Sequence, residues 1–203
     1  MHESDQEQIQ LIKDWWKQYG SAILTGVIVF LVANFGWRYW HQTTALRIAR
    51  ASVTYTQVLN AFDQKKTEDA ESLAKNLMQD YKRSPYASLA AFLLAKNAVQ
   101  DKNYSAAIED LQWIIKHAKS KSFRQVARIR LARVLIATKK PQLANEALSV
   151  IDDPAYLAMV DETKGDVFAL LGDNENAMQS YRKALNESKP ELTAPLLEMK
   201  VAE

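Results

Sequence analysis

The chain has 203 residues, 48% of them hydrophobic, and a formal net charge of +2 from 26 basic and 24 acidic side chains. Because acidic residues are scattered among the basic ones and no basic stripe forms, nucleic-acid binding is not expected. The sequence holds no cysteine, which excludes disulfides, thiolate metal sites and cysteine nucleophiles and leaves either redox compartment open.

Residues 1–17 are predicted to be a short polar tail and residues 18–40 a transmembrane helix. The 20 residues from Gln18 to Trp37 include no Asp, Glu, Lys or Arg, and as a helix they span roughly 30 Å, the thickness of a bilayer's hydrocarbon core. Aromatic residues typical of membrane–water interfaces flank this stretch: Trp15, Trp16, Tyr19, Trp37, Tyr39 and Trp40. A buried core helix and a signal peptide cleaved near Thr43 are the two other interpretations.

Small residues line one side of this predicted span. They recur at spacings of four and three, with a polar asparagine beside them: Ala22, Gly26, Val29, Ala33, Asn34 and Gly36. Such a stripe would let a second transmembrane helix approach closely, and the asparagine would favour a polar partner over lipid. Chance is an equally good explanation, because Gly and Ala are common in these helices.

The charges that flank the span do not fix its orientation. Lys13 and Lys17 precede it, whereas Arg38, Arg47 and Arg50 follow it. A simple count by the positive-inside rule would leave the larger part of the chain in the cytoplasm. The rule weakens for long translocated domains, however, and about 160 residues follow the span.

Residues 41–189 are predicted to form about four helical hairpins in an all-α domain. Gly and Pro together number only 10, and no stretch beyond the span alternates as a strand would. An alanine followed by apolar residues four and seven positions later recurs at intervals of 37, 37 and 33 residues: Ala70, Ala107, Ala144 and Ala177. A single hairpin is too small to bury its own apolar face, so the hairpins should stack into a solenoid.

These spacings resemble the tetratricopeptide repeat. The last hairpin matches best: it has small residues where its two helices approach, a glycine at the turn and a tyrosine between the two alanines of its second helix. In chain order these are Gly165, Gly172, Ala177, Tyr181 and Ala184. The other hairpins keep fewer of these residues, and none has the tryptophan of the repeat.

The first helix of each predicted hairpin would line a groove for a partner. Projecting the register of the tetratricopeptide repeat gives a mainly apolar set: Tyr55, Leu59, Phe62, Leu89, Phe92, Lys96, Ile129, Arg133, Ile136 and Met159. Such a groove suits an amphipathic helix or an unfolded segment. The same positions would equally serve as core between repeats.

Residues 190–203 carry too many apolar side chains for a loose tail. They are predicted to form a capping helix over the last hairpin. The alternative is that they fold back into the groove and occupy it until a partner arrives.

Catalytic motifs are not found in the sequence. His2, His41 and His117 have no metal-ligand spacing, and there is no phosphate-binding loop or nucleophile elbow. The acidic residues around Pro154 indicate a helix break with a cap rather than a calcium loop. We therefore predict neither an enzyme nor a cofactor or metal site.

Several segments, taken in order, resemble one family. After a short acidic tail and paired aromatics come four segments: GWRYW (36–40), RLARV (130–134), KGDVFALLGD (164–173) and LLEMK (196–200). The first and third are the specific ones. They resemble the YfgM-like ancillary subunits of the SecYEG translocon. The resemblance implies a non-enzymatic, single-pass protein of the bacterial inner membrane, with residues 1–17 as a short cytoplasmic tail and the repeats in the periplasm. It also implies three kinds of partner: SecYEG, a PpiD-type periplasmic chaperone, and nascent or unfolded secreted proteins. The alternative is a membrane-anchored scaffold that sequesters a signalling regulator.

Overall fold

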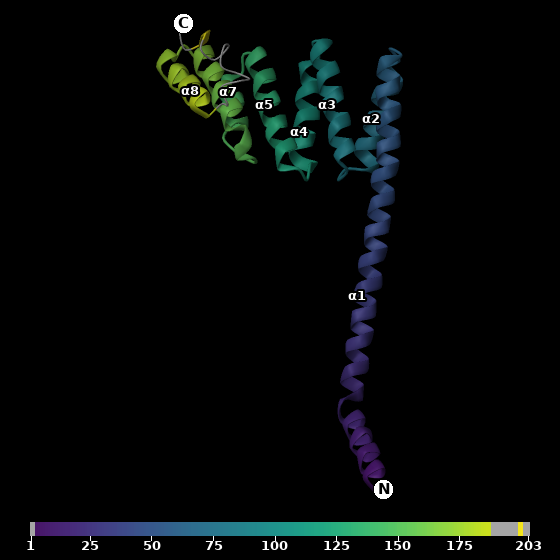
Figure 1. Cartoon of the computed structure of the whole chain (residues 1–203). Coiled ribbons are helices and arrows are strands. Elements are labelled where there is room, and N and C mark those ends of the chain that lie inside the picture. Colours follow the sequence, from purple (N-terminus) through teal and green to yellow (C-terminus); the bar gives the residue numbers. More distant parts are fainter. Residues whose placement is uncertain (1–2, 188–198, 201–203) are drawn as a thin grey trace. The chain divides into compact units, whose positions relative to one another are not determined.

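The computed structural model of the chain describes residues 3–187 and 199–200 (Figure 1). Within that part of the chain all regular structure is helical. The chain divides into two compact units, Met1–Arg47 and Ile48–Glu203. The described part of the first unit is a single helical stretch, and the second unit contains the repeats.

Helix α1 runs without a break from Glu3 to Asp63. The sequence predicts a tail, a span and a first repeat helix as separate elements with a boundary after residue 40, but one helix covers all three. The reason is local, because no Gly or Pro occurs between Trp37 and Asp63 to interrupt the helical hydrogen bonds.

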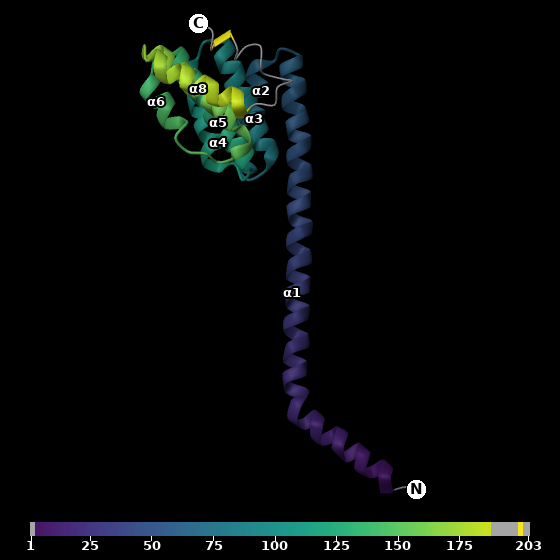
Figure 2. The same ribbon diagram turned by 60° about the vertical axis from the view of Figure 1, so that its left-hand side comes forward.

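The second unit is a stack of four helical hairpins, shown from a second side in Figure 2. The end of α1, residues 48–63, supplies the first helix of the first hairpin. The elements that follow are α2 (Thr67–Asp80), α3 (Pro85–Gln100), α4 (Tyr104–His117), α5 (Lys121–Ala137), α6 (Pro141–Ala147), the 3₁₀ turn η1 (Pro154–Tyr156), α7 (Leu157–Leu170) and α8 (Asn174–Glu187). Consecutive helices pack on each other from α2 to α5, as do α5 with α6 and α7 with α8. The predicted all-α repeat fold is therefore confirmed.

The recurring alanines lie where the two helices of each hairpin meet. Ala70, Ala107 and Ala144 are fully buried, and Ala177 is 4% exposed. The residues four positions later are buried as well: Ala74, Leu111, Leu148 and Tyr181. The small alanine side chain allows the helix axes to come close, and in the last three hairpins the larger residue one turn on fills the remaining space.

Helix α6 ends earlier than the repeat pattern predicts. It stops at Ala147, so Ile151, which the pattern would bury, is 37% exposed. The chain then breaks before Pro154, and the carboxylate of Asp153 accepts a hydrogen bond of 3.1 Å from the backbone N–H of Ala155. The predicted helix break with an acidic cap is thus confirmed at this position.

The turns of all four hairpins share one geometry. Lys65, Lys102, Lys139 and Gly172 have φ values of 58°, 58°, 57° and 77°, in the left-handed region. The next backbone N–H in each turn donates to a carbonyl five residues earlier; Asn103 donates to Ala98 at 2.7 Å, for example. This is the Schellman arrangement that ends helices. Only the fourth turn uses glycine, so the first three accept the cost of a left-handed lysine.

The closest helix approach that involves a glycine is in the last hairpin. A methyl group on Gly165 of α7 would overlap the ring of Tyr181 on α8. That ring is 7% exposed, and its hydroxyl donates a 2.9 Å hydrogen bond to Asp166 Oδ1. The ring is therefore fixed at both its face and its tip, and it has little freedom to move aside.

We predict that Gly165→Ala destabilises the domain by about 1 to 3 kcal/mol, because the added methyl group overpacks the contact with Tyr181. Thermal or urea unfolding of the purified chain measures this change. In a Tyr181→Ala background the same substitution should cost much less, since the ring that it meets is gone. Equal costs in both backgrounds would contradict the assigned contact.

Candidate interaction surfaces

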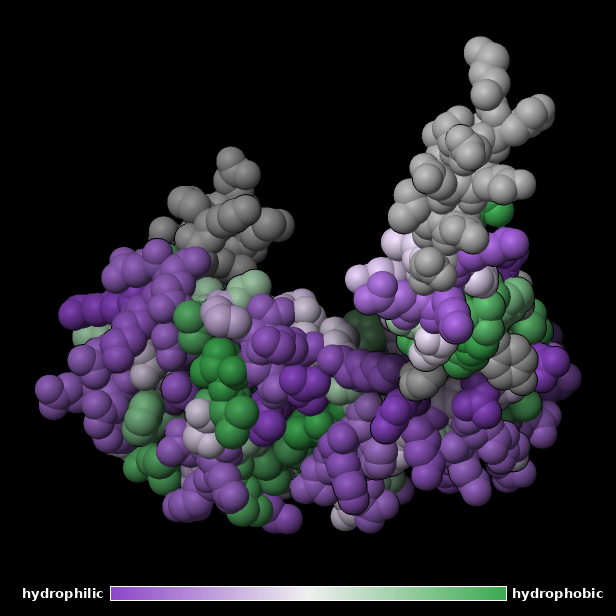
Figure 3. Space-filling view, turned by 90° about the horizontal axis from the view of Figure 1, so that it is seen from below, coloured by the Kyte–Doolittle hydropathy of each residue, from purple (hydrophilic) through white to green (hydrophobic). Residues whose placement is uncertain are grey.

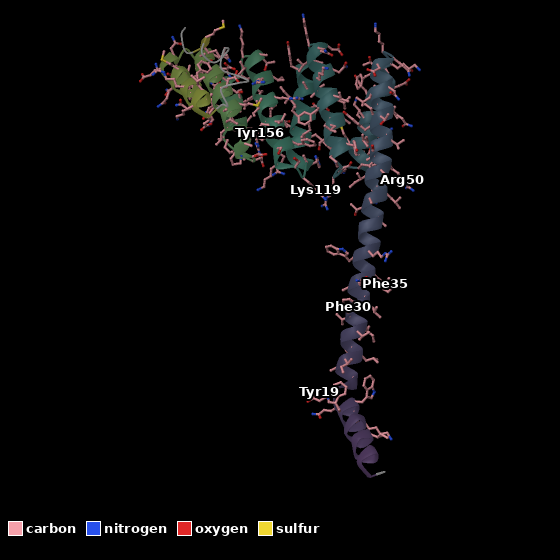
Figure 4. All side chains as sticks on the ribbon, in the orientation of Figure 1. Tyr19, Phe30, Phe35, Arg50, Lys119 and Tyr156 are labelled. Carbon is pink, nitrogen blue, oxygen red and sulfur yellow. The ribbon has the colours of Figure 1, made fainter. Side chains whose placement is uncertain are left out.

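The N-terminal part of α1 presents large apolar side chains on all sides. Val32, Phe30 and Phe35 are 68%, 66% and 69% exposed, and Figure 4 shows Phe30 and Phe35 extending from the helix. The most apolar stretch has a mean hydropathy of 1.7, and almost none of it is covered by the rest of the chain. Exposed apolar surface of this extent is unfavourable in water and favourable in lipid. By length and composition this helix fits a single membrane span.

The small-residue stripe lies within that exposed stretch. Its predicted members are all exposed: Ala22, Gly26, Val29, Ala33, Asn34 and Gly36. At Gly26 and Gly36 nothing lies within 4 Å of the place where a side chain would begin. The stripe therefore has room for a partner helix, and its use by one remains a prediction.

The predicted groove residues fall into three groups by exposure. Four are exposed: Leu59, Lys96, Arg133 and Met159. Four are half-buried: Tyr55, Phe62, Leu89 and Ile136. Two are buried: Phe92 and Ile129. We call the exposed and half-buried members, together with Glu162 of α7, the first-helix face.

The prediction that Phe92 and Ile129 face a partner is wrong. Ile129 is 1% exposed and belongs to the hydrophobic core, and Phe92 packs edge-on against Phe123 with ring centroids 6.0 Å apart. A first helix in the middle of the stack also touches the first helices before and after it, so only a narrow strip of its surface stays free. Helix α5, for example, contacts both α3 and α7.

Two residues that the sequence analysis missed complete this surface. The guanidinium of Arg130 lies 4.7 Å from the centroid of the Phe92 ring, and Tyr86 contacts Tyr55 with ring centroids 5.7 Å apart. Arg130 lies three residues before Arg133, so both occupy one ridge of α5. That spacing is the signal that could have identified Arg130 from the sequence.

The charges on the first helices change sign along the stack. Lys96 on α3 and Arg130 and Arg133 on α5 are basic and exposed, whereas Glu162 and Asp166 on α7 are acidic and half-buried. Arg133 Nη2 lies 3.7 Å from Glu162 Oε2, so the basic and acidic parts meet between α5 and α7. A partner on this face would encounter both signs of charge around a modest apolar area.

A second polar cluster fastens the loop after α6 to α5. Asp152 accepts hydrogen bonds from Arg124 Nε at 2.7 Å and Arg128 Nε at 2.8 Å, and its backbone N–H donates to Gln125 Oε1 at 2.7 Å. Burial would raise the pKa of Asp152, but the bonds from Arg128 and Arg124 outweigh burial, and the pKa lies below its usual value. This cluster is structural, because Arg124, Arg128 and the side-chain oxygen of Gln125 all bind Asp152 and hold the loop of the short third hairpin.

The described residues offer little support for a catalytic, metal or small-molecule site. His117 stacks on Trp113 with ring centroids 4.6 Å apart, and its Nδ1 lies 2.9 Å from the Trp113 carbonyl oxygen. Among the residues that the structure describes, no three His, Cys, Asp or Glu side chains could hold a metal ion. The hollow beside α1 and α2 is open and lined mainly by polar side chains, including Gln57, Asn60 and Asp69. His2 lies outside the described residues, as do all but two residues of the predicted C-terminal capping helix.

Stacked hairpins, one membrane-length helix and a mixed surface on the first helices define a class of protein, the membrane-anchored helical-repeat scaffold. The chain belongs to the family of tetratricopeptide repeat-like domains, with a match over residues 13–203.

Three relatives, each named ancillary SecYEG translocon subunit, match along nearly their whole length. The Escherichia coli protein is 25% identical over 203 residues, which is 99% of this chain and 97% of the relative. The Haemophilus influenzae protein is 26% identical over 197 residues, 97% and 96% of the two chains. The Neisseria gonorrhoeae protein is 25% identical over 203 residues, 98% and 97%. Proteins of this kind, with repeats and the role of an ancillary subunit, are non-enzymatic scaffolds, and the chain is not expected to be an enzyme.

One acidic group on the second helices has an unusual environment. Burial raises the pKa of Asp110 on α4 to about 6; Lys75 opposes the shift, whereas Glu109 and Glu71 add to it. The pKa in the folded state therefore lies above the unfolded value of 3.8. As the pH rises from about 4 to about 6, the unfolded chain loses this proton first, so folding becomes less favourable.

We predict that Asp110→Asn stabilises the domain at pH 7.5 by about 1 to 3 kcal/mol, because a neutral amide avoids the cost of burying a charge. At pH 4 most of this difference should disappear, since Asp110 is then protonated in the folded wild-type protein. Urea unfolding of both proteins at the two pH values tests this. An equal difference at both pH values would contradict the assignment.

Proposed function

We propose that this chain is an ancillary subunit of the SecYEG translocon, anchored in the inner membrane by α1, with its repeat domain in the periplasm. In this role it links the translocon to periplasmic chaperones of the PpiD type and assists the folding or trafficking of secreted proteins. The observation that carries the proposal is the extent of the match to the relatives of that name. It covers the span and the repeats together, over 99% of this chain in one case.

The two surfaces of the chain support a division of labour. The exposed small-residue stripe on α1 offers a place for a transmembrane helix of the translocon, because nothing occupies the space beside Gly26 and Gly36. The first-helix face offers the second place. Its apolar residues stand among charges of both signs, which suits an amphipathic helix or an unfolded segment of a secreted protein.

A second function, a scaffold that sequesters a signalling regulator, is favoured by one observation. Three arginines follow the span, Arg38, Arg47 and Arg50, against two lysines before it, and by count alone this would place the repeats in the cytoplasm. The weight of that count is small, because about 160 residues follow the span and long domains cross regardless of charge.

We predict that replacing Gly26 and Ala33 together with leucine reduces co-purification with SecYEG from detergent-solubilised membranes at least about threefold. The added side chains fill the stripe and keep a partner helix at a distance. A loss of about 1 kcal/mol in binding free energy is enough for a reduction of this size.

A matched control replaces Leu24 and Leu31 with isoleucine, which leaves the stripe and the hydrophobicity of the span unchanged. Both variants should remain in the membrane fraction. Full retention of SecYEG by the Gly26 and Ala33 double variant would remove the span from the docking surface.

A further inference from the structure

The side chain of Lys200 sits in an enclosed acidic site on the last hairpin. Its ammonium nitrogen lies 2.8 Å from Asp166 Oδ1 and 3.1 Å from Glu162 Oε1. The same nitrogen is 5.3 Å from the centroid of the Tyr181 ring. The side chain is 25% exposed, and that of Glu162 only 14%.

The acidic site is assembled from residues of α7 and α8 that also contact each other. Glu162 and Asp166 are one turn apart on α7, so their carboxylates project from the same ridge. The Tyr181 hydroxyl donates a 2.9 Å hydrogen bond to Asp166 Oδ1 and fixes that carboxylate from the side of α8. Two carboxylates with an aromatic ring beside them form a site for a cation, and the ammonium group of Lys200 occupies it.

The pKa of Lys200 agrees with this geometry. Burial alone would lower it, but the hydrogen bonds to Asp166 and Glu162 outweigh burial and raise the pKa above its usual value. The lysine is therefore charged at any physiological pH, and its contacts are charge-assisted hydrogen bonds.

The acidic site adjoins the first-helix face through Glu162. Glu162 is also 3.7 Å from Arg133 of α5, and Met159, one turn before Glu162, is exposed on the same ridge. Lys200, which lies 34 residues after Asp166 in the chain, therefore covers one end of the surface that a partner would use. The residue beside it, Met199, is 63% exposed, so the contact depends on the lysine rather than on burial of its neighbour.

We propose that Glu162, Asp166 and Tyr181 form a lysine-binding site for partner helices, and that Lys200 fills it in cis as a tethered competitor. The partner is an amphipathic helix that carries a lysine next to apolar residues, as this chain does in LLEMK (196–200). The inference rests on the proposed function in one respect, that the first-helix face receives partners.

The test uses a synthetic peptide of residues 190–203, labelled with a fluorophore, and the full-length chain in detergent. Wild-type protein should bind the peptide weakly, because its own Lys200 competes at an effective concentration on the order of millimolar. Lys200→Ala should bind the peptide at least about tenfold more tightly. A peptide in which Lys200 is replaced by alanine should lose most of this affinity.

Two further variants keep the result specific. Lys183→Ala removes an exposed lysine of α8 and should bind the peptide as the wild type does. Glu162→Gln with Asp166→Asn, placed in the Lys200→Ala chain, should abolish tight binding while circular dichroism shows that the helices are retained.

Equal affinity of the wild type and Lys200→Ala, including no binding by either, would overturn the proposal and leave Lys200 as a purely structural contact. The probe is this chain's own sequence and no translocon is present. A failure here is therefore distinct from a loss of SecYEG association.

Discussion

The close approach of two helices at small residues is the constraint on which the repeat domain depends. Each hairpin brings its helices together at a buried alanine, from Ala70 in the first hairpin to Ala177 in the last, and Gly165 adds a still closer contact with Tyr181. A hairpin built this way leaves apolar surface uncovered on both sides, and stacking on the next hairpin buries it. The surface left for partners is then narrow. It is the strip of each first helix that no neighbour covers. Seen from below in Figure 3, the ends of the hairpins are mostly hydrophilic, with hydrophobic residues in small groups.

Polar interactions set the details that the apolar contacts leave open. Left-handed residues such as Lys102 reverse the chain at equivalent positions of every hairpin, so the first and second helices keep one relation along the stack. The second helix of the third hairpin ends early, at Ala147. The loop that follows is held to α5 by the hydrogen bonds from Arg124 and Arg128 to Asp152. The acidic site around Lys200 is likewise held by hydrogen bonds between charged side chains. It also draws residues distant in the sequence together on the surface where partners are expected.

The features that follow from local periodicity could be predicted from the sequence, and those that depend on neighbours in the stack could not. The alanine intervals and the helix break at Pro154 are local patterns, and the structure agrees with both. Ile129 looked like a groove residue because one helix does not reveal how much of it the adjacent helices cover. The cluster at Asp152 joins side chains 24 and 28 residues apart, and no spacing rule signals it. Three of the turns have lysine at the left-handed position, where a glycine would have indicated the end of a helix.

The side of the membrane on which the repeats lie decides between the two proposed functions. The proposed translocon role puts the repeats in the periplasm, whereas the arginine count after the span would put them in the cytoplasm. Two fusions after Glu203 measure this directly. One carries a phosphatase that is active only in the periplasm, and the other carries a fluorescent protein that fluoresces only in the cytoplasm. We predict an active phosphatase and a dark fluorescent fusion. A fluorescent fusion with an inactive phosphatase would contradict the account.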